Sequence, residues 1–294
     1  MASFYDDMAA NRRNSYLLMF VVFALVFAAL YAFTLLFFGG DQLGFAISIV
    51  LAAAYISITY YFSDRIVLSM SGARPAEKGE FPYLVNVVEG LSIAAGIPAP
   101  KIYVMDDPAL NAFSTGTSPQ NSSVVFTTGL LSTMNRAELE GVAAHELSHI
   151  KNLDSRLATL VVVMVGLVAI LSDIGLRGMF WTGGRGGNRD RGGGSGLAMI
   201  IGLFIIIIAP IAAYLVRLAL SRQREFLADA TGAELTRYPE GLASALQKIK
   251  DKGSYVQHAN DATASLYFAN PLSPGQILST HPPIEERIKR LRAM

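Results

Sequence analysis

Four long runs of apolar residues interrupt a chain of otherwise soluble character. They cover residues 16–38, 43–62, 157–171 and 197–216. A helix needs about 20 apolar residues to cross roughly 30 Å of hydrocarbon. The first, second and fourth runs meet that length. The third is marginal because Asp173 lies near its end, although it extends less cleanly to Trp181. The pattern predicts two N-terminal membrane anchors and a later hydrophobic hairpin.

These runs divide the chain into four parts. They are residues 1–63, a short polar lead with two anchors; residues 64–156, of soluble character; residues 157–216, the hairpin, with a loop rich in Gly and Arg at 183–196; and residues 217–294, again of soluble character. The apolar core of the first run exceeds the roughly 7–15 residues of a signal sequence. We therefore interpret it as an uncleaved anchor, with a cleaved signal as the alternative.

Positive charge flanks the two anchors on one side only. Arg12 and Arg13 precede the first anchor, Arg65 and Arg74 follow the second, and the linker 39–42 has no Lys or Arg. Loops that carry Lys and Arg stay in the cytoplasm. The N-terminus and the segment after the second anchor are therefore expected on the cytoplasmic side.

The soluble segments contain start and stop signals for helices and strands. Pro82 and Gly96 bracket one amphipathic helix, and Asn135 with Glu138 three residues later forms a capping-box signal for another. Expected helices are residues 81–95, 135–151, 221–236, 239–252 and 283–292, and expected strands are 101–105, 111–117 and 122–128. A polar loop is expected between the last two helices. The predicted fold class is a mainly α integral membrane protein with an α+β domain that carries a small antiparallel sheet.

Composition excludes several kinds of site. Only 16% of the residues are charged and the formal net charge is +1, so no nucleic acid is expected as a partner. The chain has no cysteine, which excludes disulfides and thiolate metal ligands.

The strongest local signal is His145-Glu146-Leu147-Ser148-His149, which matches H-E-x-x-H. Residues four apart share a helix face, so both imidazoles can reach one metal ion. Glu146 would then lie beside the attacking water and take its proton as the water adds to a carbonyl. The chain has only four histidines, which makes a chance match rare. The motif predicts metal-assisted amide hydrolysis without a covalent intermediate.

A catalytic zinc takes three protein ligands, so a third ligand is needed. Asn152 and Ser155 occupy the positions where a metzincin would have Gly and a third His. Glu225 and Asp229 are the best candidates because they are four residues apart and share a helix face. One of them can bind the metal while the other accepts a hydrogen bond from a ligand histidine. The alternative is an exposed acidic face beside Arg224.

Taken in order, these motifs resemble the HtpX-type bacterial heat-shock membrane metalloproteases, within the CAAX prenyl protease-like family. The resemblance covers most of the chain, and the ordered combination of motifs is specific. After the two anchors the matching segments are 96–104, Asn111-Ala112-Phe113, the H-E-x-x-H motif, the hydrophobic hairpin, 224–229 and His281-Pro282-Pro283. The long Gly- and Arg-rich tract is less typical of the family.

The resemblance implies a zincin-like (gluzincin) catalytic domain that binds one Zn2+ per chain. By resemblance, Glu225 is the third metal ligand beside His145 and His149, and Asp229 is the hydrogen-bond partner of a ligand. Glu146 and His281 are implied as catalytic, and Asn111, Ala112 and Phe113 as substrate-binding. The implied partners are polypeptides, above all misfolded or damaged membrane proteins, and the lipid bilayer. The implied setting is protein quality control and stress response in the bacterial cytoplasmic membrane, with the catalytic domain facing the cytoplasm.

Two other functions fit parts of the pattern. One is a protease with its metal inside the bilayer, which the polar neighbours Glu138, Lys151 and Asp154 oppose. The other is a membrane scaffold with a structural metal, although structural zinc sites are usually four-coordinate and rich in Cys.

Two further expectations concern the substrate and the hairpin. An extended peptide is expected to pair with a strand edge at residues 111–115. Three ligands of one metal must lie on the same side of the membrane, so residues 150–224 cross it twice or not at all, and we favour two crossings.

Overall fold

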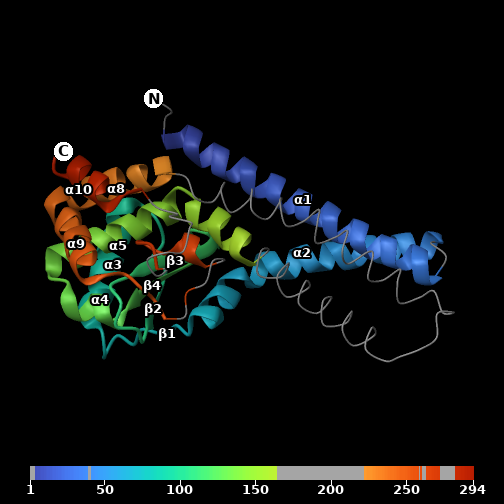
Figure 1. The fold of residues 1–294 in the computed structure, drawn as a ribbon, viewed down its shortest axis with the longest axis horizontal. Helices are drawn as coiled ribbons and strands as arrows, with labels where there is room; N and C mark the ends of the chain where they lie inside the picture. The colour runs from blue at the N-terminus through green and yellow to red at the C-terminus, as the bar shows by residue number, and fades with distance from the viewer. Residues whose placement is uncertain (1–3, 39–40, 164–221, 258, 260–262, 272–281) are drawn as a thin grey trace, which may run out of the picture.

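The computed structural model describes residues 4–38, 41–163, 222–257, 259, 263–271 and 282–294. In Figure 1 two long helices lie side by side and project from a compact body that contains a small sheet. The body is the part of the molecule that holds the H-E-x-x-H motif. Most of the expected hydrophobic hairpin, its loop at 183–196 and His281 lie outside the described residues.

The projecting helices are α1 (Phe4–Phe38) and α2 (Gln42–Ser71). The side chain of Asp41 caps α2 by accepting a hydrogen bond from the Gly44 N–H at 2.7 Å. Within the described residues, α2 is the one helix that is long and apolar enough to cross a membrane. It continues beyond the second apolar run to Ser71, so the boundary expected after residue 63 falls inside this helix.

The sheet contains β1 (Arg74–Pro75), β2 (Lys101–Met105), β3 (Ala112–Ser118) and β4 (Asn121–Thr127) in the order β1-β2-β4-β3. β3 and β4 form an antiparallel hairpin, but β2 and β4 are parallel. The sheet is therefore mixed, and the expectation of an antiparallel sheet was wrong.

The loop between β2 and β3 explains the strand order. Two hydrogen bonds hold it at the end of β4. The Thr127 hydroxyl donates to the Ala109 carbonyl at 2.6 Å, and the Gly129 N–H donates to the Asp107 carbonyl at 2.9 Å. The approach is so close that a Cβ at Gly129 would lie 2.0 Å from the Pro108 carbonyl oxygen. The chain thus passes over the end of β4, and β3 returns on the far side as an edge strand.

Helix α5 (Arg136–Lys151) lies at the centre of the body and packs against α3, α8, α9 and β3. The surrounding helices are α3 (Pro82–Ala95), α4 (Thr128–Thr133), α8 (Arg222–Thr236), α9 (Pro239–Lys252) and α10 (Ile284–Leu291). The bounds of α3, α5, α8, α9 and α10 agree with the predicted helices within one residue, whereas α4 was not predicted. The core between them includes Phe126, Val142, Leu147, Leu242 and Leu246, all fully buried.

The segment between α9 and α10 differs from the expected polar loop. Its described part contains a short 3-10 helix at Ala264–Leu266. Val256, Leu266, Tyr267 and Phe268 are buried against the sheet and the site. Apolar side chains in a short irregular segment carry no periodic signal, which is why the sequence pattern did not predict their burial.

Candidate metal centre

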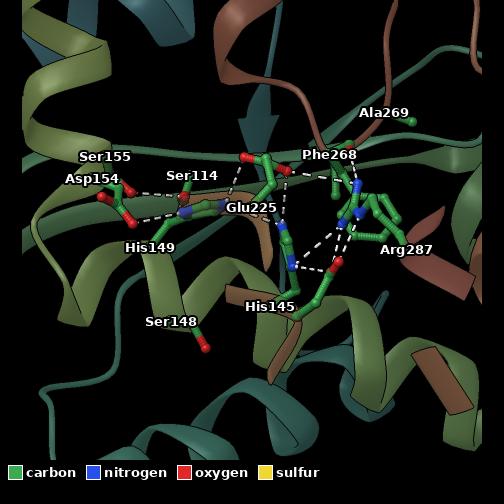
Figure 2. A network of polar contacts seen from close by, with 12 residues as sticks. Ser114, His145, Ser148, His149, Asp154, Ser155, Glu225, Phe268, Ala269 and Arg287 are labelled. Carbon is green, nitrogen blue, oxygen red and sulfur yellow. Dashed lines mark hydrogen bonds and ion pairs between the residues drawn. The ribbon is translucent and has the colours of Figure 1, made fainter. Parts of the chain in front are cut away.

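Helix α5 presents both histidines of the motif on one side, as their spacing predicts. The Nε2 atoms of His145 and His149 lie 3.1 Å apart. Figure 2 shows both rings turned toward Glu225, with Asp154 beside His149 and Arg287 beside His145. His145 is fully buried.

Glu225 comes from α8, which crosses α5 at the motif. A Cβ at Gly232 would lie 3.1 Å from the His145 backbone nitrogen, so glycine permits this close approach of the two helices. The Glu225 carboxylate oxygens lie 3.7 Å from His145 Nε2 and 3.4 Å from His149 Nε2. One donor atom from each of the three residues falls within 4.8 Å of the others. The structure therefore brings together the three residues predicted as metal ligands.

Carboxylates behind the two rings determine which ring nitrogens carry protons. His145 Nδ1 lies 3.0 Å from Asp229 Oδ1, and His149 Nδ1 lies 3.0 Å from Asp154 Oδ2. A carboxylate accepts hydrogen bonds, so each neutral ring donates from Nδ1 and leaves the lone pair of Nε2 free to bind a metal. Asp229 thus lies where the sequence placed a hydrogen-bond partner of a ligand. Asp154 was not predicted, since nothing marks an aspartate just past the end of α5.

The three converging groups fit a zinc ion. Two nitrogens bound to tetrahedral zinc at about 2.0–2.1 Å lie about 3.3 Å from each other. The 3.1 Å between the Nε2 atoms of His145 and His149 is close to that value. Two lone pairs and a carboxylate that face one point repel each other unless a cation lies between them. The donor set of two imidazoles and one carboxylate is also that of a catalytic zinc site with an open position.

Arg287 of α10 completes the surroundings of the site. It is fully buried and forms two hydrogen bonds to Asp229, from Nε at 2.8 Å and from Nη2 at 2.7 Å. Its Nη1 also donates to the Phe268 carbonyl at 2.9 Å and lies 3.6 Å from Glu225. The sequence did not indicate this role, because Arg287 lies in a short charged helix whose other basic residues are exposed.

Glu146 has the surroundings of a general base. Burial raises the pKa of Glu146 to about 7, and the nearby charge of Glu225 acts in the same direction, whereas the positive charge of His149 opposes it. The side chain is 1% exposed, and neither carboxylate oxygen has a hydrogen-bond partner within 3.5 Å among the described residues. A carboxylate in such a place can take a proton near neutral pH.

The two histidines differ in their affinity for protons. Burial lowers the pKa of His145 to about 4. Burial also disfavours the charged form of His149, but the hydrogen bonds to Asp154 and Glu225 outweigh it and raise the pKa of His149 well above its ordinary value. A metal cation therefore competes with a proton chiefly at His149.

The predicted substrate-binding residues lie at the edge of β3, where other segments already contact them. The Asn111 amide nitrogen donates to the carbonyls of Ser254 and Ala269, and its oxygen accepts from the N–H groups of Ala112 and Ala269. The Ala112 carbonyl accepts from the Phe268 N–H at 2.8 Å. These contacts occupy the first part of the predicted peptide-binding edge. Substrate contacts by Asn111, Ala112 and Phe113 stay a prediction.

A small cavity of about 30 Å³ lies beside His149 and Glu225, which are part of its lining. The lining residues are Ser114, His149, Asp154, Ser155, Ala158, Arg224, Glu225 and Leu266. Ser114, on β3, is the strand residue closest to this cavity, so it marks the part of the β3 edge that faces the site.

Comparison with known proteins shows the family of the chain. Residues 78–294 match the model of peptidase family M48. The chain is 51% identical to a protein named Protease HtpX homolog from Dictyoglomus turgidum, over 99% of this chain and 95% of the relative. A protein of the same name from Streptococcus gordonii is 42% identical over 99% of both chains. A crystal structure of S. mikatae Ste24p aligns with a TM-score of 0.48 and 20% identity, over 91% of this chain and 61% of that one.

A buried H-E-x-x-H helix with a glutamate close to both histidines is the arrangement expected of a metallopeptidase. The chain belongs to peptidase family M48, among the HtpX-type membrane proteases. The resemblance inferred from the ordered motifs is therefore confirmed.

Proposed function

We propose that this chain is a zinc-dependent endopeptidase of the bacterial cytoplasmic membrane. Its substrates would be misfolded or damaged membrane proteins, and its catalytic domain would face the cytoplasm. The observation that carries the chemistry is the convergence of the Nε2 atoms of His145 and His149 on Glu225, with the buried carboxylate of Glu146 beside them. That the substrates are polypeptides is supported by the relatives' name, Protease HtpX homolog, whereas the choice of membrane proteins rests on the resemblance of the ordered motifs and on the predicted anchors.

Each residue of the site has one task in this proposal. His145, His149 and Glu225 hold the zinc, which when bound supplies a Lewis acid that polarises the scissile carbonyl and acidifies the attacking water. Glu146 takes the proton of that water on a carboxylate oxygen and passes it to the nitrogen of the leaving amine. The products are a carboxylate and an amine, so water is consumed and no covalent link to the protein forms.

The groups behind the ligands keep the rings in the orientation that binds metal. Asp229 accepts the Nδ1 proton of His145, and Arg287 holds the Asp229 carboxylate by two hydrogen bonds. Asp154 does the same for His149. Such partners raise the basicity of the ligand and fix its tautomer. A membrane scaffold with a structural metal would not need a base such as Glu146 beside the ion.

The test separates the base from the ligands. Glu146→Gln should retain zinc and lose proteolysis, because it removes the base and leaves the three ligands. Glu225→Ala should lose both activity and tight zinc. The measurements are metal content and casein cleavage by the purified full-length chain, with chelator and zinc add-back as controls. Full zinc in the Glu225 variant, with none in Asp229→Ala, would reverse the roles of the two carboxylates.

A further inference from the structure

A helix that begins at residue 154 connects the metal centre to α1 and α2, and we call its described part, residues 154–163, the bridging helix. Its first residue, Asp154, holds His149 Nδ1 at 3.0 Å. Ser155 and Thr159 are four residues apart and share the face that contacts β3. Their hydroxyls bond to those of Ser114 at 2.8 Å and Thr115 at 2.9 Å.

The neighbouring face of the bridging helix packs on both anchors. Leu157, Leu160 and Val161 form an apolar cluster with residues of α1 and α2, including Leu18 and Tyr60. The bridging helix therefore touches the site with its first turn and the anchors along its length.

Arg156 lies where this apolar cluster begins. Its guanidinium carbon lies 4.9 Å from the ring centroid of Tyr16 in α1 and 5.7 Å from that of Tyr60 in α2. Both distances are within the roughly 6 Å over which a cation is attracted to an aromatic face. The residue is 7% exposed, and its Nε has no hydrogen-bond partner among the described residues. Arg156 thus joins the bridging helix to both anchors through two aromatic rings.

The turn that precedes the bridging helix has a backbone conformation that depends on the attachment of this helix. Leu153 lies between α5 and the bridging helix and has φ of 61°, in the left-handed region that residues other than glycine rarely adopt. A conformation of this kind persists when the surrounding structure fixes both of its arms. The arm before Leu153 is α5, which the core holds. The arm after it is the bridging helix, which is held by β3 and the anchors.

We propose that Arg156 is a positioning residue, which fixes the first turn of the bridging helix to the anchors and thereby keeps Asp154 against His149. The anchors would then be part of the catalytic centre as well as an attachment to the membrane. This inference rests on the proposed function, because it takes His149 to be a metal ligand.

The decisive measurement is the zinc affinity of the metal-free, full-length chain, determined by chelator competition. Loss of the carboxylate partner of a ligand histidine lowers metal affinity by about 10–100-fold, so Asp154→Ala should fall in that range. Arg156→Leu should lower zinc affinity in the same direction by a smaller factor, and Arg156→Lys should restore part of it because the cation is retained. The matched control is Arg65→Leu, because Arg65 is an exposed cation over the Phe62 ring on α2, 5.6 Å from its centroid. It should leave zinc affinity unchanged.

A double variant distinguishes positioning from general stability. If Arg156 acts through Asp154, then Arg156→Leu adds no further loss of zinc affinity in the Asp154→Ala background. An equal loss in both backgrounds would overturn the proposal. Unchanged zinc affinity with a lower Tm would also overturn it, since Arg156 would then be only a structural tie. Failure of the wild-type chain to bind zinc would overturn the proposed function as well.

Variants of Tyr60, whose ring contacts Arg156, test the same proposal if Arg156→Leu does not fold. Tyr60→Phe keeps the ring face and should bind zinc like the wild type, whereas Tyr60→Leu should show the loss expected of Arg156→Leu. Phe62→Leu is the control, because its ring pairs with Arg65 instead. Equal zinc affinity in Tyr60→Phe and Tyr60→Leu would contradict the role given to the rings.

Discussion

At the scale of residues, the metal centre depends on charges that the H-E-x-x-H motif does not contain. The Asp229 carboxylate is almost fully buried and accepts two hydrogen bonds from Arg287. Burial disfavours the Asp229 anion, but the charge of Arg287 and the hydrogen bonds from Arg287 and His145 together outweigh this effect and lower the pKa of Asp229. The anion in turn orients His145. A change at Arg287 is therefore expected to act on both stability and metal binding.

Replacing Arg287 by leucine leaves Asp229 as a buried charge that has lost its cationic partner. Removing one member of a buried ion pair costs about 3–5 kcal/mol, so Arg287→Leu should lower the free energy of unfolding by that amount. Urea unfolding of the metal-free chain measures it. The matched control is Arg292→Leu, whose exposed pair with Glu240 should contribute no more than about 1 kcal/mol. Equal losses in the two variants would refute the importance of the buried pair.

The residues that the sequence predicted and those it missed differ in how their partners are placed. His145, Glu146 and His149 lie within about one helical turn. Glu225 and Asp229 are four residues apart, and this spacing indicated a third ligand and a hydrogen-bond partner on one helix face. Local periodicity is enough for such groups. Asp154 reaches His149 through the turn at Leu153, which has a positive φ, and Arg287 reaches Asp229 from a helix that is distant in the sequence. Neither contact leaves a pattern in the sequence.

At the scale of elements, side-chain hydrogen bonds fix the first turn of α5. The Asn135 side chain accepts from the Glu138 N–H at 3.0 Å, and the Glu138 carboxylate accepts from the Asn135 N–H at 2.8 Å. The same carboxylate, which is 1% exposed, also accepts from Lys248 at 2.6 Å and Ser244 at 2.7 Å on α9. The capping box thus also joins α5 to α9.

These contacts predict a dependence of stability on pH. Burial opposes ionisation of Glu138, but the hydrogen bonds from Lys248, Ser244 and Asn135 outweigh it and lower the pKa of Glu138 below its ordinary 4.5. A group whose pKa is lower in the folded state stabilises the fold above the unfolded pKa and loses that effect as the pH falls through the folded pKa. At pH 7, Glu138→Gln should lower the free energy of unfolding by about 1.5–3 kcal/mol, typical of hydrogen bonds to a charged group. The difference from wild type should shrink below about pH 4.5.

The control for this prediction is Glu140→Gln on the same helix. Glu140 pairs with the exposed side chain of Arg136, so its loss should cost about 0.5 kcal/mol or less. Chemical unfolding at several pH values compares the two variants. A difference for Glu138→Gln that stays constant from pH 7 to pH 3 would rule out the ionised carboxylate as its source.

Elements themselves were more predictable than their arrangement. The bounds of α3, α5 and α9 follow from caps, prolines and glycines next to each helix, which are local signals. The order of the strands does not, because it is decided by the contact of the 106–111 loop with Thr127 and Gly129. The same limit applies to residues 264–269, whose burial depends on the edge of β3.

At the scale of the whole molecule, helices α1 and α2 pack directly on the part of the body that holds the metal centre. The last turns of α2 enter the body, where Val67 and Leu68 pack in one cluster with Met105 and Val125 of the sheet. The bridging helix packs against both α1 and α2. A chain without its anchors would therefore expose apolar surface of the catalytic domain, and detergent or lipid should be needed to keep the domain folded.

The positions of the ligands around the hairpin give a prediction about topology. His145 and His149 precede the hairpin and Glu225 follows it, yet the structure brings all three together. Residues 150–224 must then cross the membrane twice or not at all. The fourth apolar run is long enough to span, whereas the third needs local thinning or neighbouring helices. Three arginines in the loop at 183–196 oppose translocation. Two crossings are still favoured, because two long apolar runs would otherwise require a large protein surface to cover them.

Cysteine labelling tests this topology cleanly, because the chain has no cysteine of its own. Single cysteines can replace Asn188 in the hairpin loop and Ile93 on α3, where the side chain is 82% exposed. With an impermeant thiol reagent on spheroplasts, Asn188→Cys should be labelled and Ile93→Cys should be labelled only after lysis. Labelling at position 93 before lysis would reverse the proposed orientation. Protection at both positions before lysis, followed by labelling at both, would mean that the hairpin does not cross. In that case the two apolar runs must be covered by the membrane surface or by the catalytic body.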